Sequence, residues 1–449
     1  MRSLTRLSVV LLAALAVQTA SPQNQRIGLN VVLNTAPTEA ILASLGAFGA
    51  VRDVVAPLKA VTMQAPLSSL PLIRSLPFVT AANPDAERKG VPIDTVPAPD
   101  FSDGIGTWDL DAVNVMDGSA RSVAYDGSGV YVAVLDTGLV SSWRQYFPQE
   151  RIATEYGVSF GGGGGDKGTV STQPNKWQQD QNSHGTHVTS SIIGYSFGGV
   201  AVNGVAPKAT IIPVKVLNQS GRGWSSAIAR GIVYVADLKA GPLAGYPMVI
   251  NMSLGGGALD AMEKAAIDYA ITKGVVVVAS AGNEGTAGMG YPGAYPPVIS
   301  VAASGWIGEW TAGTPTWWRR DVPEDGASNF YVTTFSSRAL PGQDLDVAAP
   351  GSWVVGPYET NSGHRSYYFL GGTSMASPHV AGIVALMAQK KPALTATEAE
   401  NALTSGAIPL AAGCRNILLA PGVPGQVCWG ADATGSGLAI ADGALAAIP

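Results

Sequence analysis

Charged residues are scarce in this chain of 449 residues, because Asp, Glu, Lys and Arg make up 13% of it. An ordinary soluble domain carries about 25%. The formal net charge is −5, and no long run of Lys or Arg occurs. Nucleic-acid binding usually needs a basic stripe, so we expect no nucleic-acid partner. With 46% hydrophobic residues, the composition fits a large buried core.

The chain also lacks an apolar run of the about 18 residues that span a bilayer. At its N-terminus, Arg2 and Arg6 precede an almost wholly apolar stretch, 7–17, which small residues follow. This order is typical of a secretory signal peptide, and we assign it to residues 1–20. A membrane anchor is the alternative, but the run is short for that role. We therefore expect a secreted protein with no membrane partner.

Cysteine is nearly absent, and only Cys414 and Cys428 occur. Neither has the spacing of a zinc or redox motif. An oxidising compartment would permit a bridge, and the segment between them is rich in Pro and Gly. We favour a disulfide over two free thiols.

Three sections follow the N-terminal stretch. Residues 21–84 contain short strand-like and helix-like patterns from Arg26 onward, which predict a small αβ unit. Residues 85–105 are rich in Pro, Asp and Gly without an apolar period, which indicates a linker. From 106 to 449, near-continuous apolar strands alternate with helical patterns. This alternation predicts an α/β fold with a mostly parallel sheet covered by helices on both faces.

Three polar residues stand at the ends of expected elements. Asp136 ends a strand in VAVLDTG, His184 opens a helix in NSHGTHV, and Ser374 opens another in GGTSMASP. Function collects at the carboxyl ends of the strands in such folds. A serine nucleophile needs a base, and the base needs a partner that fixes its tautomer. Small residues around Ser374 leave room for a substrate, so we interpret the three as a candidate nucleophilic set.

These motifs resemble the subtilisin family of serine endopeptidases. VAVLDTG, HGTHVTSSIIG and GGTSMASPHVAG follow one another in the family's order of Asp, His and Ser. Further segments similar to family core motifs are INMSLGGG, VVVVASAGNEG and GYPGAYPPVISVAA. The combination is highly specific and covers roughly 105–449.

The resemblance implies a subtilisin-like peptidase domain over 106–449 with a three-layer fold. Residues 21–84 resemble, less specifically, the family's inhibitory propeptide, a small α+β domain of ferredoxin-like type. Residues 85–105 would then carry the processing site. The implied partners are protein or peptide substrates and the chain's own propeptide as an intramolecular inhibitor, and we expect a monomer.

The resemblance also assigns roles to single residues. Ser374 would attack the peptide carbonyl and form an acyl-enzyme, His184 would act as the base, and Asp136 would orient His184. Asn283 would donate its side-chain amide to the oxyanion. The implied substrate-binding residues are Ser253, Leu254, Gly255 and Gly282. No cofactor is needed for this chemistry.

Specificity is expected to be broad, because strand-like pairing with a substrate backbone reads few side chains. Gly290 stands at the base of the implied side-chain pocket, which predicts room for a large apolar residue before the scissile bond. Glu284 near the rim is an alternative determinant that would favour Lys.

Metal sites are weakly indicated. Gln145 stands where family members often have a calcium-binding aspartate, and the loop 194–204 offers few oxygen side chains beyond Asn203. A structural calcium is therefore possible but not assignable. His184 and His187 could share a helix face and bind zinc, but no third ligand or HExxH motif appears, so we expect no metal at the site.

Two segments are unusual for the family. The stretch 304–334 is rich in aromatic residues, and we favour packing over the core rather than a patch for a substrate polymer or the cell surface. The run Gly161 to Gly165 indicates a flexible loop rather than a phosphate cradle, since no Gly-Lys-Ser/Thr follows. We expect the surrounding segment, 160–181, to border the leaving-group side of the site.

Two other classes of function stay open. An esterase or lipase usually shows Gly-x-Ser-x-Gly with the order Ser, Asp, His, whereas the order here is reversed and Ala376 replaces the last glycine. A catalytically idle binding protein on the same fold would be favoured by the loss of one member of the set, and none is lost.

Overall fold

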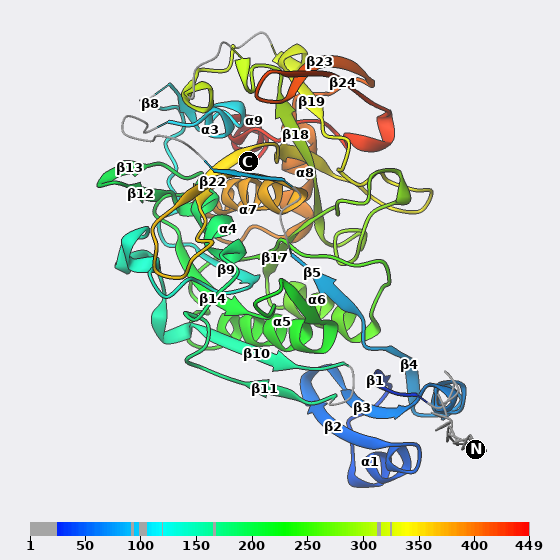
Figure 1. Cartoon of the computed structure of the whole chain (residues 1–449). Helices are drawn as coiled ribbons and strands as arrows, with labels where there is room; N and C mark the ends of the chain where they lie inside the picture. Colours follow the sequence, from blue (N-terminus) through cyan, green and yellow to red (C-terminus); the bar gives the residue numbers. More distant parts are fainter. Residues whose placement is uncertain are drawn as a thin grey trace, which may run out of the picture.

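The computed structural model describes residues 25–90, 94–97, 106–118, 120–164, 168–311, 316–323 and 326–448 (Figure 1). The signal peptide expected at 1–20 lies outside these ranges. Among the helices of the described segments, none has the length and apolar character needed to cross a bilayer.

A nine-stranded sheet forms the middle layer of the main body, in the order β11-β10-β14-β9-β16-β17-β18-β19, with β20 also paired to β18. All its pairs are parallel except β10–β11 and β18–β19. The strands are β9 (Tyr131–Asp136), β10 (Val158–Gly162), β11 (Val170–Thr172), β14 (Thr210–Lys215), β16 (Met248–Met252), β17 (Val275–Ser280), β18 (Ile299–Trp306), β19 (Phe330–Val332) and β20 (Val347–Pro350). The expected, mostly parallel sheet is confirmed.

Helices cover both faces of this sheet. On one face lie α4 (His184–Ile193) and α7 (Thr373–Lys390), and on the other α5 (Ser225–Ala240) and α6 (Ala261–Thr272) (Figure 1). Alternate residues of β9 serve the two layers: Val132 and Val134 belong to the core that contains α4 and α7, and Ala133 and Leu135 to the core under α5 and α6. Burial on both faces explains why the strands are apolar throughout, and it confirms the three-layer α/β fold.

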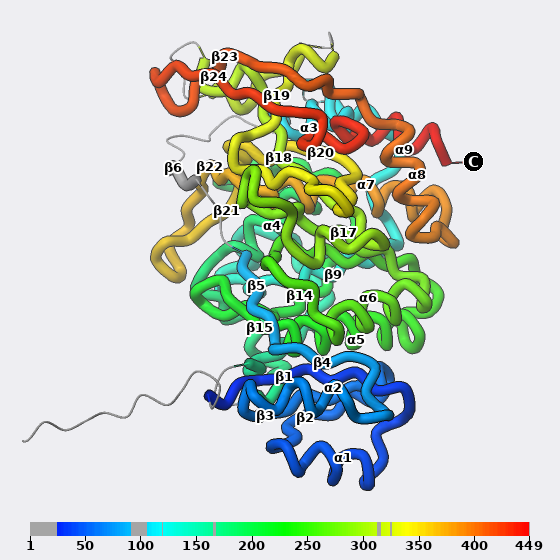
Figure 2. Tube along the Cα trace, turned by 90° about the vertical axis from the view of Figure 1, so that its right-hand side faces the viewer, coloured from blue at the N-terminus to red at the C-terminus, as the bar shows by residue number. Residues whose placement is uncertain are grey.

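Residues 26–84 form a separate four-stranded antiparallel sheet in the order β2-β3-β1-β4. Its elements are β1 (Arg26–Leu33), α1 (Glu39–Gly46), β2 (Ala50–Val55), β3 (Ala60–Pro66), α2 (Leu70–Arg74) and β4 (Val79–Pro84). This β-α-β-β-α-β order is the ferredoxin-like arrangement. The unit has its own core around Leu29 and Met63, and it is stacked against α5 and α6 (Figure 2).

The aromatic stretch 304–334 packs inward in its described part. Trp317 and Trp318 are 1% and 0% exposed, and Trp306 and Tyr331 are also buried. Trp310 contacts Trp317 and Phe369 with ring centroids 5.1 and 5.2 Å apart. The packing interpretation therefore holds for these residues.

A C-terminal hairpin, β23 (Gly413–Ala420) and β24 (Val423–Trp429), lies at the end of the molecule opposite the 26–84 unit (Figure 2). Cys414 and Cys428 face each other across it, and their sulfurs are bonded at 2.05 Å. Further elements of the main body are α3 (Trp108–Ala112), β7 (Met116–Asp117), β8 (Ala120–Arg121), β12 (Tyr195–Phe197), β13 (Val200–Val202), β21 (Val354–Pro357), α8 (Ala396–Gly406) and α9 (Ala441–Ala447).

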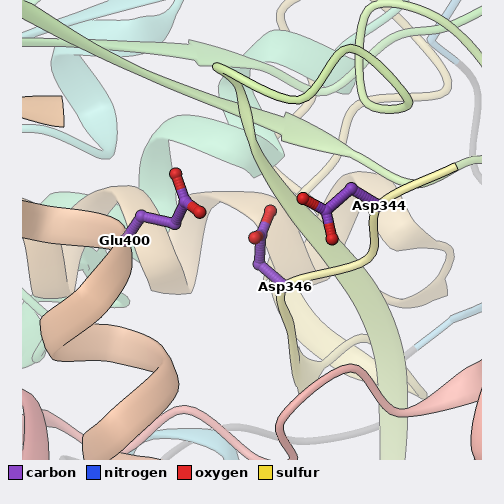
Figure 3. Close-up of side chains that lie close together, drawn as sticks. All are labelled: Asp344, Asp346 and Glu400. Carbon is purple, nitrogen blue, oxygen red and sulfur yellow. The ribbon is translucent and has the colours of Figure 1, made fainter. Parts of the chain in front are cut away.

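Three carboxylates gather where the chain enters β20. Asp344 and Asp346 lie on this loop and Glu400 on α8, with carboxylate oxygens within 4.8 Å of one another (Figure 3). Asp346 is buried and accepts hydrogen bonds from the Ser300 amide and hydroxyl at 2.7 and 2.8 Å. Burial raises the pKa of Asp346 to about 7, and the negative charges of Glu400 and Asp344 add to the shift.

This cluster predicts a loss of stability as the pH rises. The folded protein holds a proton on Asp346 that the unfolded chain releases near its ordinary pKa of 3.8, so stability is full below that pH and falls until about pH 7. We expect Asp344→Asn together with Glu400→Gln to raise the free energy of unfolding at pH 8 by about 1–2 kcal/mol. Urea unfolding of a Ser374→Ala background, which prevents self-digestion, measures this. Equal gains at pH 4 and pH 8, or the same gain from the exposed control Glu150→Gln, would contradict it.

Candidate functional site

Asp136 and His184 form a buried pair at the carboxyl end of β9. The imidazole Nδ1 lies 2.8 and 3.0 Å from the two carboxylate oxygens of Asp136. Because an ionised carboxylate can only accept, Nδ1 donates, and the other ring nitrogen, Nε2, is left as an acceptor. A Cβ at Gly185 would lie 2.4 Å from the Gly138 carbonyl oxygen, so only glycine permits this close approach.

A second group of polar residues holds this pair in place. The Thr137 hydroxyl accepts from the Gly185 amide at 2.9 Å and donates to Asp180 at 2.8 Å. Asp180 also accepts from the Ser183 amide at 2.9 Å, which shapes the turn just before His184. Burial raises the pKa of Asp180 to about 6, whereas Lys215 opposes the shift. Sequence reasoning missed these residues, although Thr137 and Asp180 lie next to or within the quoted motifs.

Ser374 lies in the first turn of α7. Its hydroxyl donates to the Ser253 carbonyl at 3.2 Å, and the Ser253 hydroxyl donates to the Ser374 carbonyl at 2.8 Å. Pro378, four residues on, has no N–H to supply the helical bond to that carbonyl. The Ser253 hydroxyl replaces it, so the strand-like segment after β16 is tied to the start of α7.

Asn283 follows β17 and faces the same helix start. Its side-chain oxygen accepts from both the amide and the hydroxyl of Thr373, each at 2.9 Å. The oxygen is thereby fixed, and the NH₂ group of the amide is left to donate elsewhere. The Gly282 amide donates to the Thr373 hydroxyl at 3.2 Å, which joins the predicted residues Gly282 and Asn283 to the α7 terminus.

Gly90 lies beside both His184 and the Ser253 carbonyl that accepts the Ser374 hydroxyl. His184 Nε2 is buried and has no hydrogen-bond partner among the described residues, because the Ser374 hydroxyl donates to Ser253 instead. A Cβ at Gly90 would lie 2.6 Å from that same Ser253 carbonyl oxygen and 3.2 Å from His184 Cε1.

Gly90 belongs to a segment of the chain's own N-terminal part that occupies the cleft. Strand β5 (Glu87–Lys89) runs antiparallel to β15 (Arg222–Trp224). On its other side, the amides and carbonyls of Lys89 and Gly255 exchange two hydrogen bonds, at 3.0 and 2.9 Å. Downstream, β6 (Asp94–Pro97) pairs with β22 (Tyr367–Gly371), which leads to Ser374. The segment expected to be a linker therefore flanks the site with β5 and β6, and Gly255 pairs with β5 as a substrate-binding strand would.

The other predicted pocket residues lie close by. Leu254 is buried, and Gly290 donates its amide to the Ala281 carbonyl at 2.9 Å. A Cβ at Gly290 would lie 3.3 Å from the backbone of Gly256, so a larger residue here would require that backbone to shift by a few tenths of an ångström. Glu284 is exposed, and its carboxylate accepts from the backbone N–H of Asn283 at 2.7 Å.

The glycine-rich segment was placed wrongly by the sequence. The hairpin β10–β11 lies beside the 26–84 unit (Figure 1), and the Gly164 amide donates to Asp85 at 2.6 Å. It thus borders the side where β5 enters the cleft, not the leaving-group side, where β6 lies. A run of glycines does not indicate which distant segment it will contact, so the contact with Asp85 could not be predicted from the sequence. Gly165 lies outside the described residues.

The sequence's candidate metal ligands have other partners. His187 Nε2 lies 3.1 Å from the Val354 carbonyl, and burial lowers the pKa of His187 to about 3. His184 faces Asp136, so the two histidines do not converge as a zinc pair. Gln145 accepts from Arg365 at 3.3 Å. A structural calcium stays an expectation that these contacts do not assign.

Comparison with known proteins agrees with this geometry. The profile of the Subtilase family matches residues 127–430. Subtilisin DY from Bacillus licheniformis is 36% identical over 294 residues, 65% of this chain and 88% of that protein. Thermitase from Thermoactinomyces vulgaris is 35% identical over 265 residues, 59% of this chain and 77% of its own.

Solved structures share the fold over more of the chain. Fervidolysin from Fervidobacterium pennivorans, described as a keratinolytic enzyme related to subtilisin, aligns with a TM-score of 0.66 at 24% identity, over 94% of this chain and 61% of that one. Sphericase aligns with a TM-score of 0.56 at 30% identity, over 76% of this chain and 99% of its own. The chain therefore belongs to the subtilase family and is a serine endopeptidase.

Proposed function

We propose that the chain is a secreted endopeptidase of broad specificity in which Ser374, His184 and Asp136 act as a catalytic triad. The single observation that carries this proposal is the buried Asp136–His184 pair, because its imidazole lies beside Gly90, next to the Ser253 carbonyl that accepts the Ser374 hydroxyl. No cofactor takes part. Protein and peptide substrates are the partners, and the enzyme acts as a monomer.

The reaction follows from which groups of the site can donate a proton and which can accept one. Ser374 Oγ attacks the peptide carbonyl carbon while its proton passes to His184 Nε2. The tetrahedral intermediate collapses as the C–N bond breaks, and His184 returns the proton to the leaving amine. Water then hydrolyses the acyl-enzyme by the same route. Asp136 stabilises the imidazolium that forms in each step.

The oxyanion of the intermediate is stabilised by the Asn283 side-chain amide and the Ser374 N–H. Support for this role comes from the two Thr373 hydrogen bonds that fix the Asn283 oxygen, since they leave the amide N–H groups as donors. Loss of such a donor lowers the rate by about 10²–10³, a magnitude that was measured on subtilisin.

The 26–84 unit acts as an inhibitory propeptide that the enzyme removes by cutting itself within 85–105. The pairing of β5 with β15 and Gly255 supports this role, because a substrate would need the same backbone partners. The unit is further held by the ion pair of Arg230 with Asp53 on β2. Secretion places the Cys414–Cys428 pair in an oxidising compartment, where its bridge persists.

We further propose that residues of large apolar side chain are preferred directly before the scissile bond. The reason is Gly290, which contributes no side chain to the implied pocket. Ser253, Leu254, Gly255 and Gly282 contact the substrate backbone there. A peptide library that returned Ala or Gly at this position would contradict the preference.

Labelling with an organofluorophosphate tests the proposed function. We expect one phosphoryl group on the peptide that contains Ser374, and casein hydrolysis should fall in proportion to the labelled fraction. An esterase would hydrolyse small esters and leave casein intact. An idle binding protein would show neither label nor turnover, and either result would overturn the proposal.

A further inference from the structure

Arg88 is fully buried although the strand that carries it crosses a surface cleft. Its side chain is 0% exposed, whereas those of its neighbours Glu87 and Lys89 are 36% and 51% exposed. Alternate residues of a strand point to opposite faces. Of the three residues of β5, only the arginine therefore enters the body of the enzyme.

The buried guanidinium meets one carboxylate. Arg88 Nε lies 3.2 and 3.0 Å from the two oxygens of Glu263, and Nη2 makes a further bond to the same carboxylate. Nη2 also donates to the Ala258 carbonyl at 2.9 Å. A Cβ at Gly256 would lie 3.1 Å from Nη1, so the bare glycine leaves room for the planar group. This forked contact is one that arginine makes and lysine does not.

Glu263 belongs to the enzyme body, in the first turn of α6, and its side chain is 1% exposed. Apart from Arg88, the only hydrogen-bond partner of the Glu263 carboxylate among the described residues is the Ser225 hydroxyl, at 3.5 Å. Burial raises the pKa of Glu263, and Arg88 opposes that shift. A buried carboxylate without a partner is strongly unfavourable. The space beside Glu263 is thus suited to a cation. Arg88 fills it here, and under the proposed function Arg88 leaves with the propeptide.

We infer that Glu263 forms a specificity subsite for arginine at the fourth position before the bond that is cleaved. This inference rests on the proposed function. The register comes from Gly90, which lies beside His184 and Ser253, next to the nucleophile. If the next residue along the chain is counted as the one before the cleaved bond, Arg88 stands three residues before it and takes the fourth position. A peptide substrate bound in this register places its own fourth residue against Glu263.

Fluorogenic peptides test the subsite on the matured enzyme. The peptides share an apolar residue before the scissile bond and differ at the fourth position, which carries Arg, its neutral isostere citrulline, Lys or Leu. We expect kcat/KM for Arg to exceed that for citrulline and for Leu by about 10- to 100-fold, with Lys between them. The comparison of Arg with citrulline needs no variant and isolates the charge.

Two variants assign the effect. Glu263→Gln should reduce the ratio of kcat/KM for Arg to that for citrulline below about threefold, because a neutral amide does not attract the guanidinium charge. The variant should still cleave the Leu peptide. Glu150→Gln, an exposed glutamate on the surface, should keep the full ratio.

Equal rates for Arg, citrulline and Leu would overturn the subsite and leave the proteolytic function intact, provided that a separate sample of the same enzyme takes the organofluorophosphate label on Ser374. An arginine preference at the third or fifth position instead would overturn it as well. If no peptide is cleaved and Ser374 takes no label, the proposed function itself fails. An Arg preference that survives Glu263→Gln would remove Glu263 from the explanation.

Discussion

Asp136→Asn should lower kcat by about 10⁴-fold with little change in fold. The Thr137 amide donates to one oxygen of Asp136 at 2.6 Å, so an asparagine would keep its carbonyl oxygen there. Its NH₂ group would then face His184 Nδ1, which must become the acceptor. Nε2 would carry the proton and could not take the one from Ser374. This effect requires no change in position, only a change of tautomer.

Steady-state hydrolysis of a small ester measures this loss after an unrelated protease has removed the N-terminal unit from the variant, so that self-processing is not needed. Circular dichroism should match that of the unmodified enzyme. Asp117→Asn, at an exposed surface position, serves as the control and should retain full kcat. A loss of less than tenfold in Asp136→Asn would show that the carboxylate does not set the tautomer.

Ser374→Ala should abolish turnover, with a loss of about 10⁶-fold in kcat, a magnitude carried over from subtilisin. The variant retains the helix start and the Ser253 hydroxyl bond to the backbone carbonyl of residue 374, so it should fold. Under the proposed self-processing, the purified variant should keep its precursor size, with β5 still paired to β15.

Gel electrophoresis and intact mass follow this outcome over time in a purified preparation. Ser405→Ala, exposed on α8, should mature as the unmodified chain does. If Ser374→Ala matures at the normal rate without added protease, self-cleavage is wrong and another protease performs the processing.

The sequence identified those site residues that stand at ends of regular elements. Asp136 ends a buried strand and His184 begins a helix, so the rule that parallel strands gather their carboxyl ends predicted both at one rim of the sheet, and the family resemblance assigned their roles. Asp180 has no such mark, because it lies in a loop and acts through Thr137. Its role depends on a hydrogen bond across loops, which no periodicity predicts.

The segment 85–105 shows a different limit. Its composition indicates a linker, and yet β5 pairs with Arg222–Trp224, far along the chain. Three residues have too little pattern to predict a strand, and their partner is set by the surface of the finished enzyme. The burial of Arg88 could not be predicted either, because its partner Glu263 is distant in the sequence and is brought to it by the position of α6 in the folded enzyme.

The central claim is that Ser374 and His184 act together on a bound peptide, and a crystal structure with a peptide boronate would test it most directly. With the matured enzyme and a boronate that carries Arg at the fourth position, we expect boron bonded to Ser374 Oγ. His184 Nε2 should lie about 2.6–3.2 Å from the bound oxygen atoms, with Asn283 donating to the boronate. Boron attached elsewhere, or an imidazole that stays out of hydrogen-bonding reach of the bound serine, would contradict the account.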